Sequence, residues 1–202
     1  MEKQKYAAIV LAAGSGKRMN SQVHKQYLII QDRPVLYYSL KEFEDSAVDE
    51  IVLVVGKGEE EFCRREIVDK YGISKVKAIV EGGKERYHSV FEGLKQTSDA
   101  DYVLIHDGAR PFVNQDIIRR CMQEVQKYQA CVVGMPVKDT IKIADEEGYA
   151  KQTPDRKNVW MIQTPQTFSY ALIYEAYEEM LKTEDAAITD DAMVLERTKG
   201  KK

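Results

Sequence analysis

The chain is poor in cysteine and has no long hydrophobic run. Its 202 residues include three cysteines, Cys63, Cys121 and Cys131, an odd number without CxxC spacing. This pattern argues against a disulfide framework or a cysteine-rich metal site, and we expect three reduced thiols. The longest apolar runs, at residues 7–13 and 51–55, are far too short to cross a bilayer, so we expect no membrane partner.

An excess of basic residues is also missing. The formal net charge is -3, and Lys and Arg are spread through the chain, which argues against a nucleic-acid partner. The first five residues lead directly into a strand-like run without a signal-peptide pattern, so we expect a cytoplasmic protein. The histidines His24, His88 and His106 lack metal-ligand spacing, and we predict no zinc site.

What the chain does contain is an alternation of strand and helix patterns. Short apolar runs, rich in β-branched residues, predict buried strands at residues 6–12, 50–55, 76–80, 102–106 and 130–135. Helical patterns lie between them. The sequence therefore predicts one α/β domain over residues 1–202, with a mainly parallel sheet covered by helices on both faces.

The helices have recognisable ends. We expect a helix over residues 34–43 with Asp32 as its cap, and a second over residues 59–71 that Gly72 terminates. The spacing of Tyr87, Val90, Phe91 and Leu94 predicts a third helix, and Asn114 caps a fourth.

The alternation stops after Pro136. Residues 137–160 are polar and contain the alternating segment 140–143, which predicts a β-hairpin arm outside the main sheet. The α/β pattern returns with a strand at residues 160–168 and a helix at about residues 169–182.

The loop after the first strand carries two glycines and several cations. A dinucleotide fingerprint would need a third glycine at Met19, and a P-loop would need glycine at Leu11 and Ser or Thr at Arg18. With both motifs excluded, Lys17, Arg18 and the nearby Lys25 favour phosphate binding beside glycines that allow close backbone approach. The alternative is a solvated basic loop.

Two further loops follow predicted strands. Arg86, Ser89 and Gly93 share one helix face after the third strand, where a small hydroxyl and glycine carbonyls suit a base edge; the alternative is a helix N-cap turn. After the fourth strand, Asp107 suits a ribose hydroxyl or Mg²⁺, and the alternative is an ion pair with Arg110.

Together these loops resemble the 2-C-methyl-D-erythritol 4-phosphate cytidylyltransferase family of the non-mevalonate isoprenoid pathway. The resemblance rests on Ala12-Ala13-Gly14-Ser15-Gly16-Lys17-Arg18-Met19, Lys25-Gln26-Tyr27, Gly82-Gly83-Lys84-Glu85-Arg86, His106-Asp107-Gly108-Ala109-Arg110-Pro111, Pro136-Val137-Lys138-Asp139-Thr140, Asp155-Arg156, Gln163-Thr164-Pro165-Gln166 and Thr189-Asp190-Asp191-Ala192. It implies a Rossmann-like, three-layer α/β/α nucleotidyltransferase domain. It also implies transfer of CMP from CTP to methylerythritol phosphate with release of pyrophosphate, Mg²⁺ as cofactor, and a homodimer in which the arm helps to build the partner's site.

The resemblance also assigns roles to residues. Arg18 and Lys25 match the family's transition-state stabilisers, and Asp107 matches its ribose or metal contact. The expected CTP contacts are Ala12, Ala13, Gly14, Ser15, Gly16, Gly83 and Ser89. The groups expected to hold the methylerythritol phosphate are Arg110, Thr140 and Arg156.

One departure from the family pattern concerns the end of the chain. The family continues beyond the equivalent of Lys202 with another strand, another helix and an Asn-x-Lys segment that positions substrate, and nothing in this sequence matches them. A non-catalytic nucleotide-binding module would also fit a chain without that segment.

Two other enzyme classes are alternatives to the methylerythritol phosphate enzyme. Ribitol 5-phosphate cytidylyltransferases are similar but tend to carry Ser-Val in place of Gly108-Ala109, and a sugar-1-phosphate uridylyltransferase would differ in the base that it binds near Gly83 and Ser89.

Overall fold

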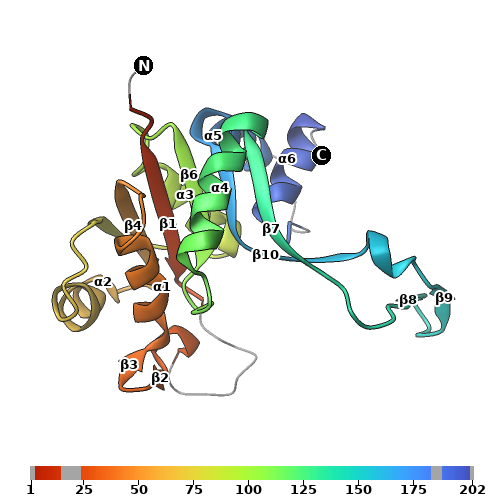
Figure 1. The fold of residues 1–202 in the computed structure, drawn as a ribbon, viewed down its shortest axis with the longest axis horizontal. Helices are drawn as coiled ribbons and strands as arrows, with labels where there is room; N and C mark the ends of the chain where they lie inside the picture. Colours follow the sequence, from red (N-terminus) through yellow and green to blue (C-terminus); the bar gives the residue numbers. More distant parts are fainter. Residues whose placement is uncertain (1–2, 15–23, 183–187, 201–202) are drawn as a thin grey trace.

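A six-stranded sheet forms the centre of the computed structural model, which describes residues 3–14, 24–182 and 188–200 (Figure 1). The strand order is β5 (Val76–Glu81), β4 (Glu50–Val55), β1 (Tyr6–Ala12), β6 (Tyr102–Asp107), β10 (Trp160–Ser169) and β7 (Ala130–Pro136). Strand β1 pairs parallel with β4 and β6, whereas β10 is antiparallel to β6 and β7. The predicted, mainly parallel sheet is confirmed, and β10 is the strand that runs against its neighbours.

The central strands are mostly apolar, and both of their faces are covered. All six residues of β4 are buried. Along β1, Ala8 and Val10 belong to one hydrophobic cluster, and Ala7 and Ile9 belong to the other. Successive side chains of a strand point to opposite faces, so the two clusters are the two helix–sheet interfaces of a three-layer molecule.

Helices from different parts of the chain cover each face. The first face carries α1 (Val35–Glu44), α2 (Glu60–Cys63), the π-helix η3 (Arg64–Asp69) and α4 (Gln115–Tyr128). The second face carries α3 (Arg86–Leu94), α5 (Tyr170–Met180) and α6 (Asp191–Lys199). The helix expected over residues 59–71 is present without a break from Glu60 to Asp69, with α-helical hydrogen bonding that changes to π-helical at Arg64, and Gly72 follows with a φ of +63°.

The expected cap of α1 is wrong. Gln31 and Asp32 have φ angles of 49° and 66° and form the turn between β2 (Ile29–Ile30) and β3 (Arg33–Pro34). Pro34 is therefore the N-cap of α1. By contrast, Asn114 caps α4 as predicted, because its side chain accepts a hydrogen bond from the Ile117 amide.

The predicted arm is present and leaves the body of the molecule between β7 and β10 (Figure 1). It contains β8 (Ile143–Ala144), β9 (Ala150–Gln152) and the 3₁₀ helix η4 (Arg156–Asn158). The paired region is shorter than the alternating segment 140–143 indicated, because the β8–β9 ladder begins at Ile143.

Helix α6 is an element that the sequence did not predict. Asp190 caps it by accepting a hydrogen bond of 2.9 Å from the Met193 amide, and Val194 and Leu195 are buried against the second face. None of the helices in the described part of the chain has the length and apolar character needed to span a membrane.

Candidate functional site

Loops after three parallel strands meet at one edge of the sheet. The carboxyl ends of parallel strands share an edge, and ligands of such sheets bind there. The loop after β5 touches the loop after β1: a Cβ added to Gly82 would lie 2.5 Å from the Ala13 Cβ and 2.7 Å from the Ser89 Oγ. Glycine is therefore required at residue 82 for the loops after β1 and β5 to approach each other.

The loop after β5 is a helix cap as well as a candidate base-binding segment. The Ser89 hydroxyl is buried, accepts a hydrogen bond of 3.1 Å from the Gly83 amide and donates one of 3.2 Å to the Glu85 carbonyl. Glu85 and His88 form a capping box at the start of α3. Ser89 thus fixes the backbone of Gly83, while the cytidine contacts expected of Gly83 and Ser89 stay predictions.

Asp107 stands at the end of β6 between two arginines. Its Oδ1 accepts a hydrogen bond of 3.2 Å from Arg86 Nε, and its Oδ2 accepts one of 3.0 Å from Arg110 Nε. Burial raises the pKa of Asp107, but the two guanidinium groups outweigh burial and hold that pKa below its ordinary value. The carboxylate is therefore anionic at neutral pH, and the ion pair with Arg110 is formed.

Arg86 connects Asp107 to a buried carboxylate on α6. Its Nη1 and Nη2 donate to the two oxygens of Asp191 at 2.9 Å each, and the Tyr177 hydroxyl donates to Asp191 Oδ1 at 2.6 Å. Burial raises the pKa of Tyr177, and the Asp191 charge raises it further, so the hydroxyl keeps its proton. The sequence indicated this segment only as the motif 189–192, without a role for Asp191.

A buried histidine fixes the backbone of the loop after β6. The His106 ring lies 3.1 Å from the Arg110 carbonyl through Nε2 and 3.0 Å from Thr164 Oγ1 through Nδ1. Thr164 Oγ1 also accepts from the Asp107 amide at 3.2 Å. This pattern requires hydrogen on Nε2 and none on Nδ1. Burial lowers the pKa of His106 to about 4, so the ring is neutral and structural.

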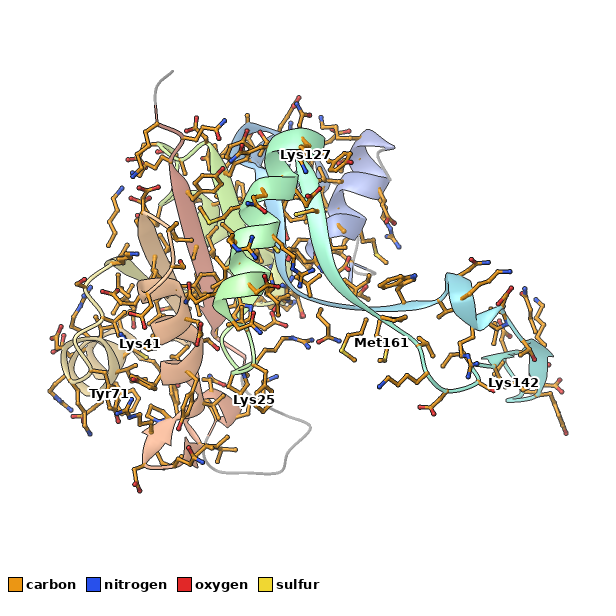
Figure 2. All side chains as sticks on the ribbon, viewed as in Figure 1. Lys25, Lys41, Tyr71, Lys127, Lys142 and Met161 are labelled. Carbon is orange, nitrogen blue, oxygen red and sulfur yellow. The ribbon has the colours of Figure 1, made fainter. Side chains whose placement is uncertain are left out.

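The predicted cation Lys25 lies in the 3₁₀ helix η2 (Lys25–Tyr27), with its side chain exposed (Figure 2). Next to it, the buried Gln26 donates from Nε2 to the Ala12 carbonyl at 2.5 Å and to the Gly14 carbonyl at 3.2 Å. Gln26 therefore attaches Lys25 to the loop after β1. The other predicted residues of that loop, Ser15, Gly16 and Arg18, lie outside the described residues, and their roles stay predictions.

The remaining predicted residues do not join this cluster within one chain. Thr140 and Arg156 belong to the arm, where Arg156 Nη1 donates to the Lys138 carbonyl at 2.7 Å. Figure 2 shows the separation: Lys25 lies at the body of the molecule and Lys142 lies far out on the arm. The same chain therefore brings together Ala13, Gly82, Arg86, Asp107 and Arg110, but leaves the arm residues apart from them.

The described residues of the site do not form a set of metal ligands by themselves. No group of three or more His, Cys, Asp or Glu side chains in residues 3–14, 24–182 and 188–200 is placed to hold one. Asp107 is a carboxylate at the end of β6, beside the loop after β1. Both of its oxygens already accept from guanidinium groups, so a Mg²⁺ ion here would be held chiefly by substrate phosphates and water, with Asp107 as its protein ligand.

Comparisons with known proteins show the family of the chain. The family model IspD, 2-C-methyl-D-erythritol 4-phosphate cytidylyltransferase, matches residues 6–202. The 2-C-methyl-D-erythritol 4-phosphate cytidylyltransferase of Lachnoclostridium phytofermentans is 51% identical over 193 residues, which are 96% of this chain and 83% of the relative. The protein of the same name from Lachnospira eligens is 54% identical over 192 residues, 94% of this chain and 84% of that protein.

A solved structure is also similar. The crystal structure of 4-diphosphocytidyl-2C-methyl-D-erythritol synthase from Anaerococcus prevotii matches with a TM-score of 0.84 and 34% sequence identity. The match covers 96% of this chain and 82% of that one. Sequence and fold both match over nearly the whole length, and the chain belongs to the 2-C-methyl-D-erythritol 4-phosphate cytidylyltransferase family.

Proposed function

We propose that this protein transfers CMP from CTP to 2-C-methyl-D-erythritol 4-phosphate and releases pyrophosphate, a step of the non-mevalonate isoprenoid pathway. The observation that carries the proposal is a family match over residues 6–202 that includes every loop at the candidate site. The clustering of Ala13, Gly82, Arg86, Asp107 and Arg110 at one sheet edge supports it.

The chemistry is an in-line displacement at phosphorus. An oxygen of the acceptor's phosphate attacks the α-phosphorus of CTP, a new P–O bond forms, and the bond to the β-phosphate oxygen breaks as pyrophosphate leaves. A phosphate monoester has a second pKa of about 6, so the nucleophile is already largely anionic at neutral pH and no general base is needed. The neutral, buried His106 fits a site without a catalytic base.

The protein's task is then to hold two polyanions together and offset their charge. Lys25, and with it Arg18, would stabilise charge on the α-phosphoryl group. Arg110 would grip the acceptor phosphate, because a guanidinium can form two parallel hydrogen bonds to phosphate. The Arg110 guanidinium already donates hydrogen bonds from Nε to Asp107 and from Nη1 to Gln163, and these bonds restrict its orientation.

Asp107 would receive the ribose or a divalent cation. Its charge is maintained by Arg86 and Arg110, so it presents a fixed acceptor at the end of β6. Mg²⁺, when bound with Asp107 and the CTP phosphates, would neutralise negative charge on the nucleotide. The backbone beside Gly82 and Gly83, fixed by Ser89, would face the cytosine.

A homodimer would bring the arm to a site. The arm leaves the body, so Thr140 and Arg156 would need a second copy to approach a phosphate. Several apolar side chains of the arm and its base are exposed, among them Ile143, Trp160, Met161 and Ile162. Such side chains indicate an interaction surface, and a two-fold partner would cover them by reciprocal contact.

Pyrophosphate release tests the proposed reaction. We expect release from CTP with Mg²⁺ and 2-C-methyl-D-erythritol 4-phosphate, and much less when UTP replaces CTP or ribitol 5-phosphate replaces the acceptor. Faster release with ribitol 5-phosphate would assign the other acceptor, and faster release with UTP would assign a uridylyltransferase. No release from any pair, by a protein whose folding is verified by circular dichroism, would indicate a nucleotide-binding module.

A further inference from the structure

The turn that carries Lys25 is attached to the rest of the protein on both sides. Gln26 binds it to the loop after β1, as described above. His24 and Tyr27, which flank Lys25 and Gln26, both reach the loop after β4. The side chain of Lys25 itself is exposed, so its ammonium group is accessible to a ligand.

One carboxylate, that of Glu59, contacts both flanking residues. Its Oε1 lies 2.9 Å from His24 Nδ1, and its Oε2 accepts a hydrogen bond of 2.7 Å from the Tyr27 hydroxyl. Burial raises the pKa of Tyr27, and the neighbouring Cys63 and Glu59 raise it further, so the hydroxyl stays protonated and donates. The two ends of a four-residue segment are thus bound to the two oxygens of a single side chain.

Glu59 is itself held in one position. Its Oε2 accepts from the Gly56 amide at 3.1 Å, and its own amide donates to the Gly56 carbonyl at 3.0 Å. A Cβ at residue 56 would lie 2.7 Å from Glu59 Oε2, so glycine is needed for this carboxylate to fold back over its own loop. The carboxylate therefore has a defined place at the end of β4.

We infer that Glu59 is a positioning residue for Lys25: its carboxylate, bound to His24 and Tyr27, fixes the direction in which Lys25 presents its ammonium group to the reacting phosphates. The inference rests on the proposed role of Lys25. A misplacement of about 1 Å in a catalytic group can cost on the order of 10²-fold in rate, so the orientation of this turn bears directly on turnover.

A double-mutant cycle separates this role from a general contribution to folding. The variants are Glu59→Gln, Lys25→Ala and their combination, and the measured quantities are kcat, the KM for CTP and the melting temperature. Glutamine keeps the shape of Glu59 but leaves only one acceptor oxygen for three neighbours, which are His24, the Tyr27 hydroxyl and the Gly56 amide. We expect Glu59→Gln to lower kcat roughly tenfold or more with a much smaller change in KM, the pattern of a lost transition-state contact.

The decisive result is the effect of Glu59→Gln once Lys25 is absent. If Glu59 acts through Lys25, adding Glu59→Gln to Lys25→Ala changes kcat less than about twofold, because coupled residues are non-additive. Equal losses in both backgrounds, or an unchanged kcat in the single variant, would overturn the inference. If Lys25→Ala has no measurable rate, Lys25→Arg takes its place in the cycle.

Two further variants complete the design. Tyr27→Phe removes one of the donors to Glu59 without changing its charge, and we expect a smaller loss of kcat in the same direction; it also replaces Glu59→Gln in the cycle if that variant does not fold. Glu60→Gln, one residue along and on α2, is the matched control and should keep wild-type kcat. Wild-type protein that releases no pyrophosphate would refute the proposed function, whereas active wild type with an additive cycle refutes only the role of Glu59.

Discussion

Arg86 donates two hydrogen bonds of 2.9 Å to the carboxylate of Asp191, although 105 positions of the sequence separate the two residues. Asp191 is fully buried and begins α6, whereas Arg86 begins α3 and reaches Asp107 with its Nε. The guanidinium group of Arg86 therefore connects α6 to Asp107 at the candidate site.

Loss of the Asp191 carboxylate should destabilise the fold. Asp191→Ala leaves the Arg86 guanidinium and the Tyr177 hydroxyl without their shared acceptor, and removal of one member of a buried pair costs about 3–5 kcal/mol. Because the Arg86 side chain is 33% exposed, we expect the lower end, about 3 kcal/mol, from urea denaturation. Asp116→Ala, which breaks the exposed pairs with Arg119 and Arg120, is the control and should cost less than about 1 kcal/mol. Equal costs for the two variants would contradict a special role for Asp191.

Lys25→Ala should lower kcat far more than it raises the KM for CTP. The ammonium group is proposed to act where charge develops on the α-phosphoryl group, and removal of one electrostatic stabiliser costs on the order of 10²–10³-fold in kcat. Steady-state kinetics at varied CTP measure both constants. Lys41→Ala, which removes an exposed lysine of α1, should leave them unchanged. A variant with normal kcat and a raised KM would make Lys25 a ground-state binding residue.

His106 should make stability depend on pH in the acidic range. Its pKa falls from an ordinary value of 6.5 to about 4 in the folded protein because the ring is buried. Between these values the unfolded chain binds the proton more readily, so the stabilisation is fully present above pH 6.5 and is lost as the pH falls towards 4. From pH 7 to pH 5 the contribution to the free energy of unfolding should fall by about 2 kcal/mol. Urea denaturation of the wild type and of His106→Gln measures it: the variant should show a smaller fall, and an identical pH dependence of both proteins would contradict the assignment.

Arg156 is expected to act in the site of a partner copy. Arg156→Ala should raise the KM for the acceptor phosphate and leave CTP binding nearly intact, whereas the adjacent control Lys157→Ala should change little. Mixing Arg156→Ala with Lys25→Ala chains tests the geometry, because a mixed dimer then has one site with both groups. Random mixing should restore about a quarter of the wild-type rate, since half of the dimers are mixed and each has one intact site. Mixtures that stay inactive, although mass spectrometry of tagged chains verifies subunit exchange, would show that Arg156 acts within its own chain.

The sequence predicted the elements whose pattern is local. Strands β1 and β4 were predicted to the residue, because burial on both faces leaves an unbroken apolar run with sharp ends. Asp32 was wrongly expected to cap α1, since a cap and a turn residue with positive φ have the same chemistry. Helix α6 was missed because its apolar residues form one run at 192–195 without helical spacing, and the helix is short.

For the candidate site, too, the sequence predicted residues that follow strands but not contacts between distant segments. Asp107 was found because it follows a predicted strand, and the carboxyl ends of parallel strands converge. The partners of Arg86 and the carboxylate of Glu59 were not found, since Asp191 and Glu59 meet their partners only through the packing of α6 and of the loop after β4. No periodicity or motif spacing reports contacts between residues 32 or 105 positions apart.

Strands β7 and β10 are neighbours in the sheet, and the arm connects them. The two strands pair from Phe168 opposite Ala130 to Trp160 opposite Pro136, so the arm is the long connection of a single hairpin. A hairpin connection can grow, shrink or be replaced without changing the order of any strand, and doubling its length costs only about 0.6 kcal/mol in closure entropy. Evolution can therefore exchange the arm as a unit, while the strand order and the sheet edge that carries Asp107 stay the same.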